Sequence, residues 1–83
     1  MGKEHDTRIV KAAAAEIKSR RARIDINQEE LAHRADVHRS YIARLEVGQS
    51  QPTLAVFIRI ARALEADPAE VLGAIVKRSK RES

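Results

Sequence analysis

Residues 28–48 of the chain read QEELAHRADVHRSYIARLEVG, and this stretch decides the fold. Apolar residues recur every three or four positions in each half of it, which is the spacing of an amphipathic helix. The pattern predicts two short helices, over about residues 28–34 and 38–47, with a tight turn at residues 36–37. Gly48 follows the second helix, at the position where a left-handed residue commonly ends a helix.

The sequence around this pair predicts three more helices and no strand. One covers about residues 6–23. Asn27 is the predicted N-cap of the first short helix. Thr53 is the predicted N-cap of a fourth helix that ends near residue 65. Asp67, followed by a proline and then a glutamate, has the pattern of a helix start and begins the fifth.

Length and composition exclude several classes of protein. The chain has 83 residues, which suits one domain of modest stability, and it contains no cysteine for disulfides or thiolate metal sites. No apolar run approaches the roughly 20 residues of a membrane span, and the polar first ten residues lack the apolar core of a secretory signal. Tyr41 and Phe57 are the only aromatic residues, which argues against base stacking on RNA or single strands. The net charge of +4 gives weak support for phosphate binding.

Polar side chains with donor groups remain on the outside of the second short helix. They cluster toward its N-terminal end and are His38, Arg39, Ser40, Tyr41 and Arg44. A helix inserted in the major groove of DNA reads base edges with such side chains. The alternatives are an ordinary amphipathic helix pair, a phosphate contact or a solvated side chain for Arg39, and a core position for Tyr41.

Several pieces of the chain together resemble the Cro/phage-repressor-like, or XRE, family of helix-turn-helix proteins. The resemblance covers about residues 17–72. The matching pieces are Gln28-x-x-Leu31-Ala32, Ile42-x-x-Leu45-Glu46-x-Gly48, Pro52-Thr53, Ile60-Ala61-x-Ala63-Leu64 and Val71-Leu72. The compact size and Arg39-Ser40-Tyr41-Ile42 are most similar to controller proteins of restriction–modification systems.

The resemblance implies an all-α, five-helix, lambda-repressor-like fold and a sequence-specific regulator of transcription that binds double-stranded DNA. The chain departs from the family pattern at Asp36, which replaces the usual glycine of the turn. Aspartate tolerates left-handed backbone better than most residues, so the turn is expected to survive. The chain also departs at Val47 and Gln49, where relatives often carry polar or basic residues, and fewer phosphate contacts are expected from that loop.

Carried over residue by residue, the resemblance implies three sets of site residues. Those expected at base edges are His38, Arg39, Ser40 and Arg44. Those expected at phosphates are Gln28, Tyr41 and Gln49. Arg21 and Glu46 resemble a family ion pair that ties the first helix to the recognition helix. Among these, Arg39 is expected to pair with the O6 and N7 atoms of guanine.

Five short helices cannot enclose every apolar residue of the last two, so the sequence predicts a two-fold dimer. The expected interface is Val56, Phe57, Ile60, Leu72, Ile75 and Val76. A homodimer implies a roughly palindromic operator, with half-sites about 34 Å apart. A different partner for the same surface, as in an antitoxin, is the alternative. The expected organisation is one DNA-binding and dimerisation domain over residues 1–78 and a basic, disordered tail over residues 79–83.

Other kinds of site find no support in the sequence. His5, His33 and His38 form no pair four residues apart on one helix, so no metal is expected. The three glycines are scattered and no catalytic set is arranged. We therefore expect no enzyme, no cofactor and no small-molecule ligand. The expected location is the cytoplasm, at the nucleoid.

Overall fold

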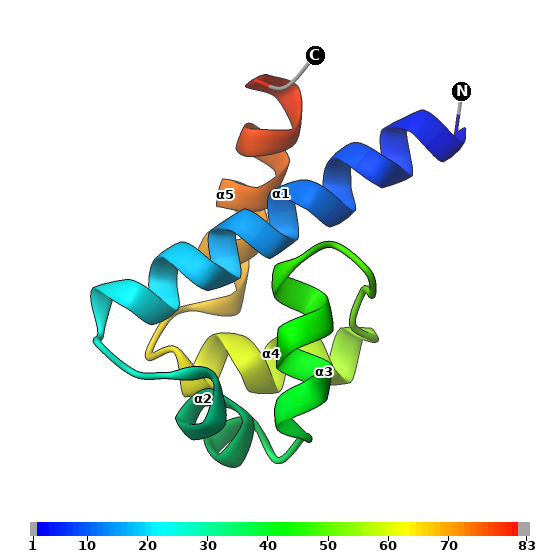
Figure 1. Ribbon diagram of the computed structural model, residues 1–83. Helices are drawn as coiled ribbons and strands as arrows, with labels where there is room; N and C mark the ends of the chain where they lie inside the picture. The colour runs from blue at the N-terminus through cyan, green and yellow to red at the C-terminus, as the bar shows by residue number, and fades with distance from the viewer. Residues whose placement is uncertain (1, 82–83) are drawn as a thin grey trace.

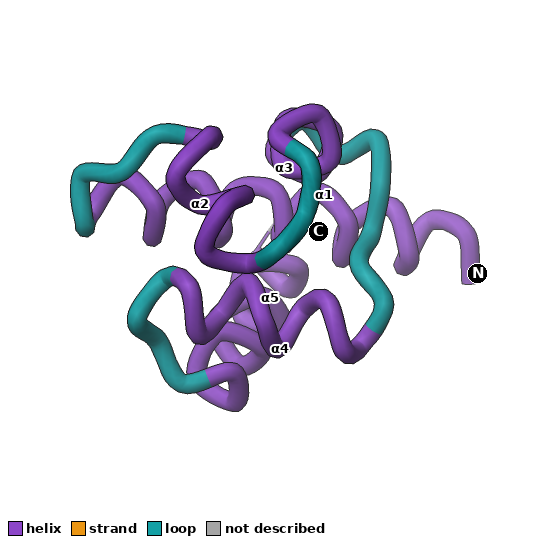
Figure 2. The backbone as a smooth tube through the Cα atoms, turned by 90° about the horizontal axis from the view of Figure 1, so that it is seen from below, coloured by secondary structure: helices purple, strands orange, loops and turns teal. Residues whose placement is uncertain are grey.

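Five α-helices build the part of the chain that the computed structural model describes, residues 2–81. They are α1 (Gly2–Arg23), α2 (Gln28–Ala35), α3 (Arg39–Glu46), α4 (Leu54–Ala63) and α5 (Pro68–Arg81). Figure 1 shows α1 crossing above α2, α3 and α4, with α5 behind it. Figure 2 shows α2 and α3 side by side from below, with the turn between them toward the viewer. None of these helices is both long and apolar enough to cross a membrane.

Two clusters of buried apolar side chains hold the helices together. The larger cluster lies behind α2 and α3 and consists of Ile17, Leu31, Ala32, Ala35, Ile42, Leu45, Ile60, Ala63 and Leu64. The smaller cluster joins α1, α4 and α5 and consists of Ala12, Phe57, Ala61, Val71 and Ile75. Burying each large side chain of this kind stabilises a fold by roughly 1.5–3 kcal/mol. The two short helices are therefore fixed by a core that leaves their outer sides to solvent.

These clusters contain three residues that the sequence analysis placed in a dimer interface. Phe57, Ile60 and Ile75 are only 9%, 1% and 3% exposed. Side chains with so little surface belong mainly to the core, although Phe57 and Ile75 also line the open groove beside Leu72. Helical periodicity marked an apolar face here without indicating which neighbour covers it. The exposed or half-buried members of the expected set are Val56, Leu72 and Val76.

The caps and the turn follow the local predictions. Asn27 Oδ1 accepts a hydrogen bond from the backbone N–H of Glu30 at 2.8 Å. Thr53 Oγ1 accepts one from the backbone N–H of Val56 at 3.2 Å. Asp36 adopts the left-handed conformation in the turn, with φ 58° and ψ 51°. The turn therefore forms with aspartate where the family usually has glycine.

Both outer helices are longer than the sequence predicted. α1 begins at Gly2 rather than near residue 6. α5 continues to Arg81, so the expectation of a disordered tail is wrong for residues 79–81; residues 82–83 lie outside the described part. Ser79 is only 7% exposed. Contacts with the rest of the fold thus stabilise the end of the last helix. The basic composition of this segment did not predict these contacts.

A buried carboxylate ties α5 to α1. Glu16 of α1 is 3% exposed, and it accepts hydrogen bonds from Arg78 Nε of α5, at 2.7 Å, and from Arg20 Nε. Burial alone raises the pKa of Glu16, but the hydrogen bonds from the two arginines outweigh it and hold the pKa below its ordinary value. The end of the chain is therefore held by a charged contact as well as by apolar packing.

A second buried carboxylate joins α1, α2 and α3, and it forms the ion pair that the resemblance implied. Arg21 Nε lies 2.7 Å from Glu46 Oε2, and Arg21 Nη2 lies 2.9 Å from Glu46 Oε1. Arg21 Nη1 also donates to the carbonyl of Ile26 at 2.9 Å. Gln28 Nε2, at the start of α2, donates to Glu46 Oε1 at 3.0 Å. Burial raises the pKa of Glu46, but these hydrogen bonds bring it below the ordinary value.

Removing the cation beside Glu46 should destabilise the fold. Arg21→Met keeps an apolar stem but leaves the Glu46 side chain, 2% exposed, without its charged partner. Because an unpaired buried charge is strongly unfavourable, we expect the free energy of unfolding to fall by about 3 kcal/mol, measured by urea denaturation at neutral pH. Arg23→Met, at an exposed position on the same helix, is the control. Equal losses in the two variants would contradict the role of the ion pair.

Acid should weaken the fold through Glu16 and Glu46. Both have a lower pKa in the folded protein than the ordinary 4.5, so below that pH the unfolded chain binds more protons. Their contribution is fully present above pH 4.5 and is lost as the pH falls through the folded values. Glu16→Gln should be less stable than the wild type at neutral pH, and the difference should shrink in acid. Urea denaturation over a pH series checks this, and a constant difference would refute it.

Candidate nucleic-acid interface

The exposed face of α3 carries the side chains expected at base edges. His38, Arg39, Ser40 and Arg44 are all exposed, whereas Ile42 and Leu45 of the same helix are buried. His38 lies at the N-cap and its side chain makes no capping hydrogen bond. An α-helix with its side chains is about 10–12 Å across, which fits the major groove, about 12 Å wide, and the eight residues of α3 form about two turns. The helix can therefore present all four side chains to one groove.

Tyr41 partly takes the core position that the sequence left open as an alternative to a DNA contact. It is half-buried against the larger cluster. The guanidinium carbon of Arg44 lies 6.0 Å from the centre of its ring. At this distance the ring face attracts the cation. Tyr41 therefore packs against the core while it restrains Arg44 on the outer face of α3.

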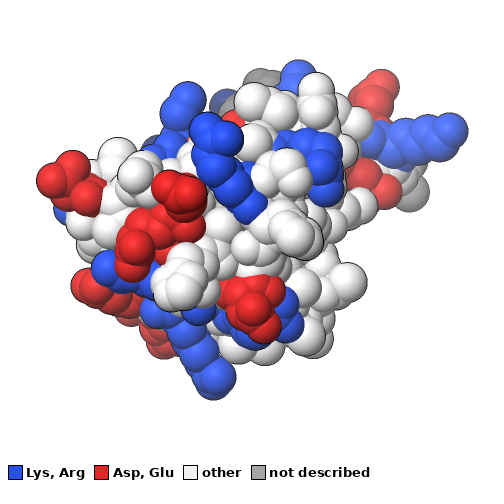
Figure 3. All heavy atoms as spheres, turned by 60° about the horizontal axis from the view of Figure 1, so that its bottom comes forward, with Lys and Arg blue, Asp and Glu red and all other residues white. Residues whose placement is uncertain are grey.

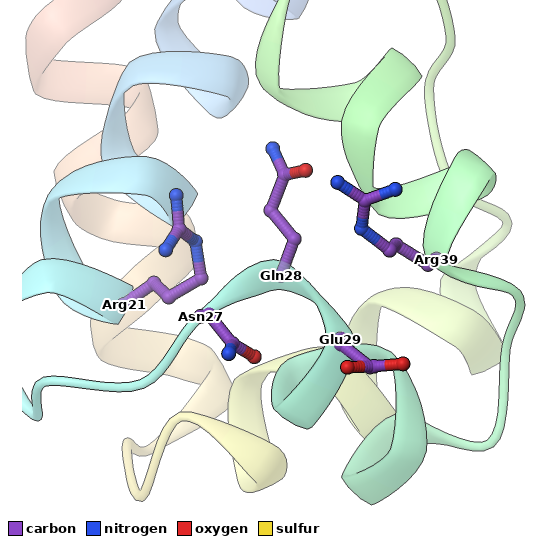
Figure 4. Close-up of a pocket in the computed structure, with 5 residues that line it drawn as sticks. All are labelled: Arg21, Asn27, Gln28, Glu29 and Arg39. Atoms are coloured by element: carbon purple, nitrogen blue, oxygen red, sulfur yellow. The ribbon is translucent and has the colours of Figure 1, made fainter.

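Arg39 shares an open hollow of about 540 Å³ with the start of α2. The other lining residues are Arg21, Asn27, Gln28 and Glu29. In Figure 4 the Gln28 side chain stands between those of Arg21 and Arg39, and the Glu29 carboxylate lies below Arg39. One N–H of the Gln28 side-chain amide donates to Glu46, which leaves its second amide N–H and its backbone N–H as donors at this site. The positive end of α2 thus lies beside the exposed face of α3, and a helix N-terminus of this kind favours an anionic group.

The loop after α3 offers little positive charge. Gln49 is exposed, and its backbone N–H donates to the carbonyl of Arg44 at 2.9 Å. Residues 45–58 contain no lysine or arginine. Figure 3 shows basic and acidic groups mixed over the face that carries α2 and α3, with no continuous basic patch. The interface therefore depends on individual side chains rather than on a broad positive field.

Sequence reasoning missed a residue beside the turn. Arg59 of α4 donates from Nε to the carbonyl of Ala35 at 2.9 Å, and from Nη2 to the carbonyl of Asp36 at 3.4 Å. A basic residue is expected near the C-terminal carbonyls of a helix, but this one comes from 24 residues further along the chain. Only the packing of α2 on α4 brings it there.

Comparison with known proteins identifies the family. The sequence profile of the HTH_3 helix-turn-helix family matches residues 17–71. The clp gene regulator ClgR from Corynebacterium glutamicum has a similar structure, with a TM-score of 0.84 and 26% identity over 89% of this chain and 79% of that chain. The restriction–modification controller protein C.AhdI from Aeromonas hydrophila has a TM-score of 0.72 and 27% identity over 75% of this chain and 94% of that chain. No curated protein sequence matches the chain.

The matched residues run from the second half of α1, through the α2–α3 pair, to the first turn of α5. They include the ion pair, the turn and the exposed face of α3. The chain therefore belongs to the HTH_3 family of helix-turn-helix DNA-binding proteins.

Proposed function

We propose that this DNA-binding protein regulates transcription as a homodimer that occupies a roughly palindromic operator. The observation that carries the proposal is the set of exposed donors on α3 beside the N-terminus of α2. Arg39 is the strongest base reader, because its planar fork matches the O6 and N7 atoms of guanine and an open hollow surrounds it. Arg44, His38 and Ser40 complete the base-reading set.

Phosphate contacts fix the position of α3 in this proposal. Gln28 supplies the backbone N–H at the positive end of α2. Tyr41 and Gln49 supply a hydroxyl and an amide on the flanks of α3. Contacts of this kind set orientation and register on the duplex but carry no sequence information themselves.

A second copy of the chain is proposed to cover an apolar surface on α4 and α5. Leu54, Leu72 and Val76 are 75%, 52% and 43% exposed. Leu54 and Leu72 line one open groove of about 290 Å³ with residues of α1, α4 and α5. Clustered exposed side chains of this type mark interaction surfaces, and a domain of 83 residues gains stability when they are buried. Val56 is half-buried on α4 and packs against the larger cluster, beside Tyr41 and Arg44 rather than in this groove.

The compact chain favours the controller type of regulator, because it spans 94% of the length of C.AhdI. We therefore propose restriction–modification genes as its targets. Regulation by occupying an operator needs no catalytic group, and it takes place in the cytoplasm, where the operator lies. An antitoxin is the second candidate, and the apolar groove of α4 and α5 favours it, since a toxin would then fill that groove.

Selection of bound duplexes from a random DNA pool tests the proposal, and the same selection with Arg39→Ala tests the base contact of Arg39. The wild type should recover two half-sites related by a two-fold axis. The variant should lose roughly 1–3 kcal/mol of affinity for the recovered duplex and relax the preference at one position of each half-site, because a bidentate base contact is gone.

Arg62→Ala, at an exposed position on α4, is the matched control and should leave the recovered sequence unchanged. A pool in which no sequence is enriched would refute sequence-specific binding. Equal weakening of selected and random DNA by Arg39→Ala would make Arg39 a phosphate contact instead.

A charge on the apolar surface of α5 should separate the dimer. Sedimentation velocity of Leu72→Glu should show a monomer where the wild type is a dimer, because a carboxylate would be buried in the interface. Val47→Glu is the control, since Val47 is also exposed, at 67%, but lies in the loop after α3. A wild-type monomer that becomes stable only with a different protein would contradict the homodimer and favour the antitoxin.

A further inference from the structure

Two arginines tie α2 and α4 together at their C-terminal ends. Arg59 of α4 donates to the carbonyls of Ala35 and Asp36 at 2.9 and 3.4 Å. Arg34 of α2 donates from Nη1 to the carbonyl of Ala63 at 3.3 Å. Ala35 and Ala63 are the last residues of α2 and α4. The final carbonyl of each helix is therefore bound by an arginine side chain from the other helix. The last carbonyls of a helix lack partners within the helix and favour a cation.

The end of α2 that Arg59 holds is also the turn that sets the direction of α3. Asp36 has φ 58° there, a conformation that costs a non-glycine residue about 1–2 kcal/mol. The backbone N–H of Val37 donates to the carbonyl of Ala32 at 3.0 Å and closes the turn. Only Val37 and His38 separate Asp36 from α3. A change in the backbone angles of Asp36 is therefore transmitted directly to the recognition helix.

We propose that Arg59 is a positioning residue for DNA recognition. By holding the carbonyls of Ala35 and Asp36, it keeps the turn in the left-handed conformation that glycine adopts without strain. The arginine thus compensates for the aspartate that this chain carries in place of the family glycine. Arg59 acts through the direction of α3 and contacts neither base nor phosphate. The proposal rests on the base-reading role proposed above for α3.

Arg34 does not share this role, although it is the reciprocal contact. It binds the carboxylates of Glu30 and Glu65 as well as the end of α4. Its hydrogen bond to Ala63 acts on the end of α4 rather than on the carbonyls of the turn, although it lies in the same open hollow as Asp36 and Arg59. Arg59 is the arginine of the pair that touches the turn itself.

Arg59→Met is the test, with Arg62→Met as the matched control. Arg62 is exposed on the same helix, and no hydrogen bond of its side chain is found among the described residues. We expect Arg59→Met to weaken binding to the selected duplex about tenfold, equal to about 1.4 kcal/mol, while binding to a random duplex of equal length changes less than twofold. Both variants are compared at a temperature where circular dichroism shows them fully folded.

The salt dependence excludes a direct contact. The slope of log K against log salt concentration should be the same for Arg59→Met and the wild type. A slope reduced by about 0.9 means that Arg59 neutralises a phosphate, and this overturns the proposal. Equal effects of Arg59→Met and Arg62→Met on the selected duplex also overturn it.

A double substitution tests the link to the turn. Asp36→Gly should restore most of the lost affinity in the Arg59→Met background, because glycine needs no support in the left-handed conformation. The gain from Asp36→Gly should be much smaller in the wild-type background, and this difference is the coupling between the two residues. Equal gains in both backgrounds overturn the proposal.

Hydrogen exchange of the Val37 amide, measured without DNA, separates the two proposals. In Arg59→Met, the hydrogen-exchange rate of this amide should be several times higher than in the wild type, because the turn opens more often. Unchanged exchange overturns the contact between Arg59 and the turn. Faster exchange with unchanged DNA discrimination overturns the positioning role of Arg59 and leaves the base-reading role of α3 intact, because Arg39→Ala tests that role separately.

Discussion

The carboxylate of Glu46 is the point to which three helices are attached. Glu46 is the last residue of α3. Its carboxylate accepts hydrogen bonds from two nitrogens of Arg21 in α1 and from the side-chain amide of Gln28 in α2. A buried ion pair of this kind adds little net stability compared with apolar packing, but it strongly disfavours any arrangement that separates its partners. α3 therefore cannot shift along α1 without leaving a charge unpaired. The place of Arg39 beside the start of α2 follows from this constraint.

Local signals predicted the parts of the structure that local physics decides. Asn27 and Thr53 cap helices because their side-chain oxygens reach a backbone N–H three residues on. Asp36 forms the turn because its short polar side chain tolerates left-handed backbone. The exposed face of α3 follows in the same way, since a helical period that buries one side leaves the opposite side to solvent.

The periodicity of the sequence did not predict the contacts between segments that lie far apart along the chain. Phe57 and Ile75 read as an apolar surface, and only the packing of α1 on α4 and α5 shows that they are core. The hydrogen bond from Arg78 to Glu16 joins residues 62 positions apart in the sequence, and it holds the basic end of α5 against α1. The ion pair between Arg21 and Glu46 was found through family resemblance rather than through spacing.

The position of the chain ends has a practical consequence. α5 runs back to α1, where Arg78 and Glu16 join the two helices, and both ends of the described chain lie on the opposite side of the molecule from α2 and α3 (Figure 1). A fluorescent protein or an effector domain fused to either end would project away from α2 and α3. Because α3 carries the proposed DNA contacts, the fold is suited to serve as the DNA-targeting half of a synthetic fusion protein.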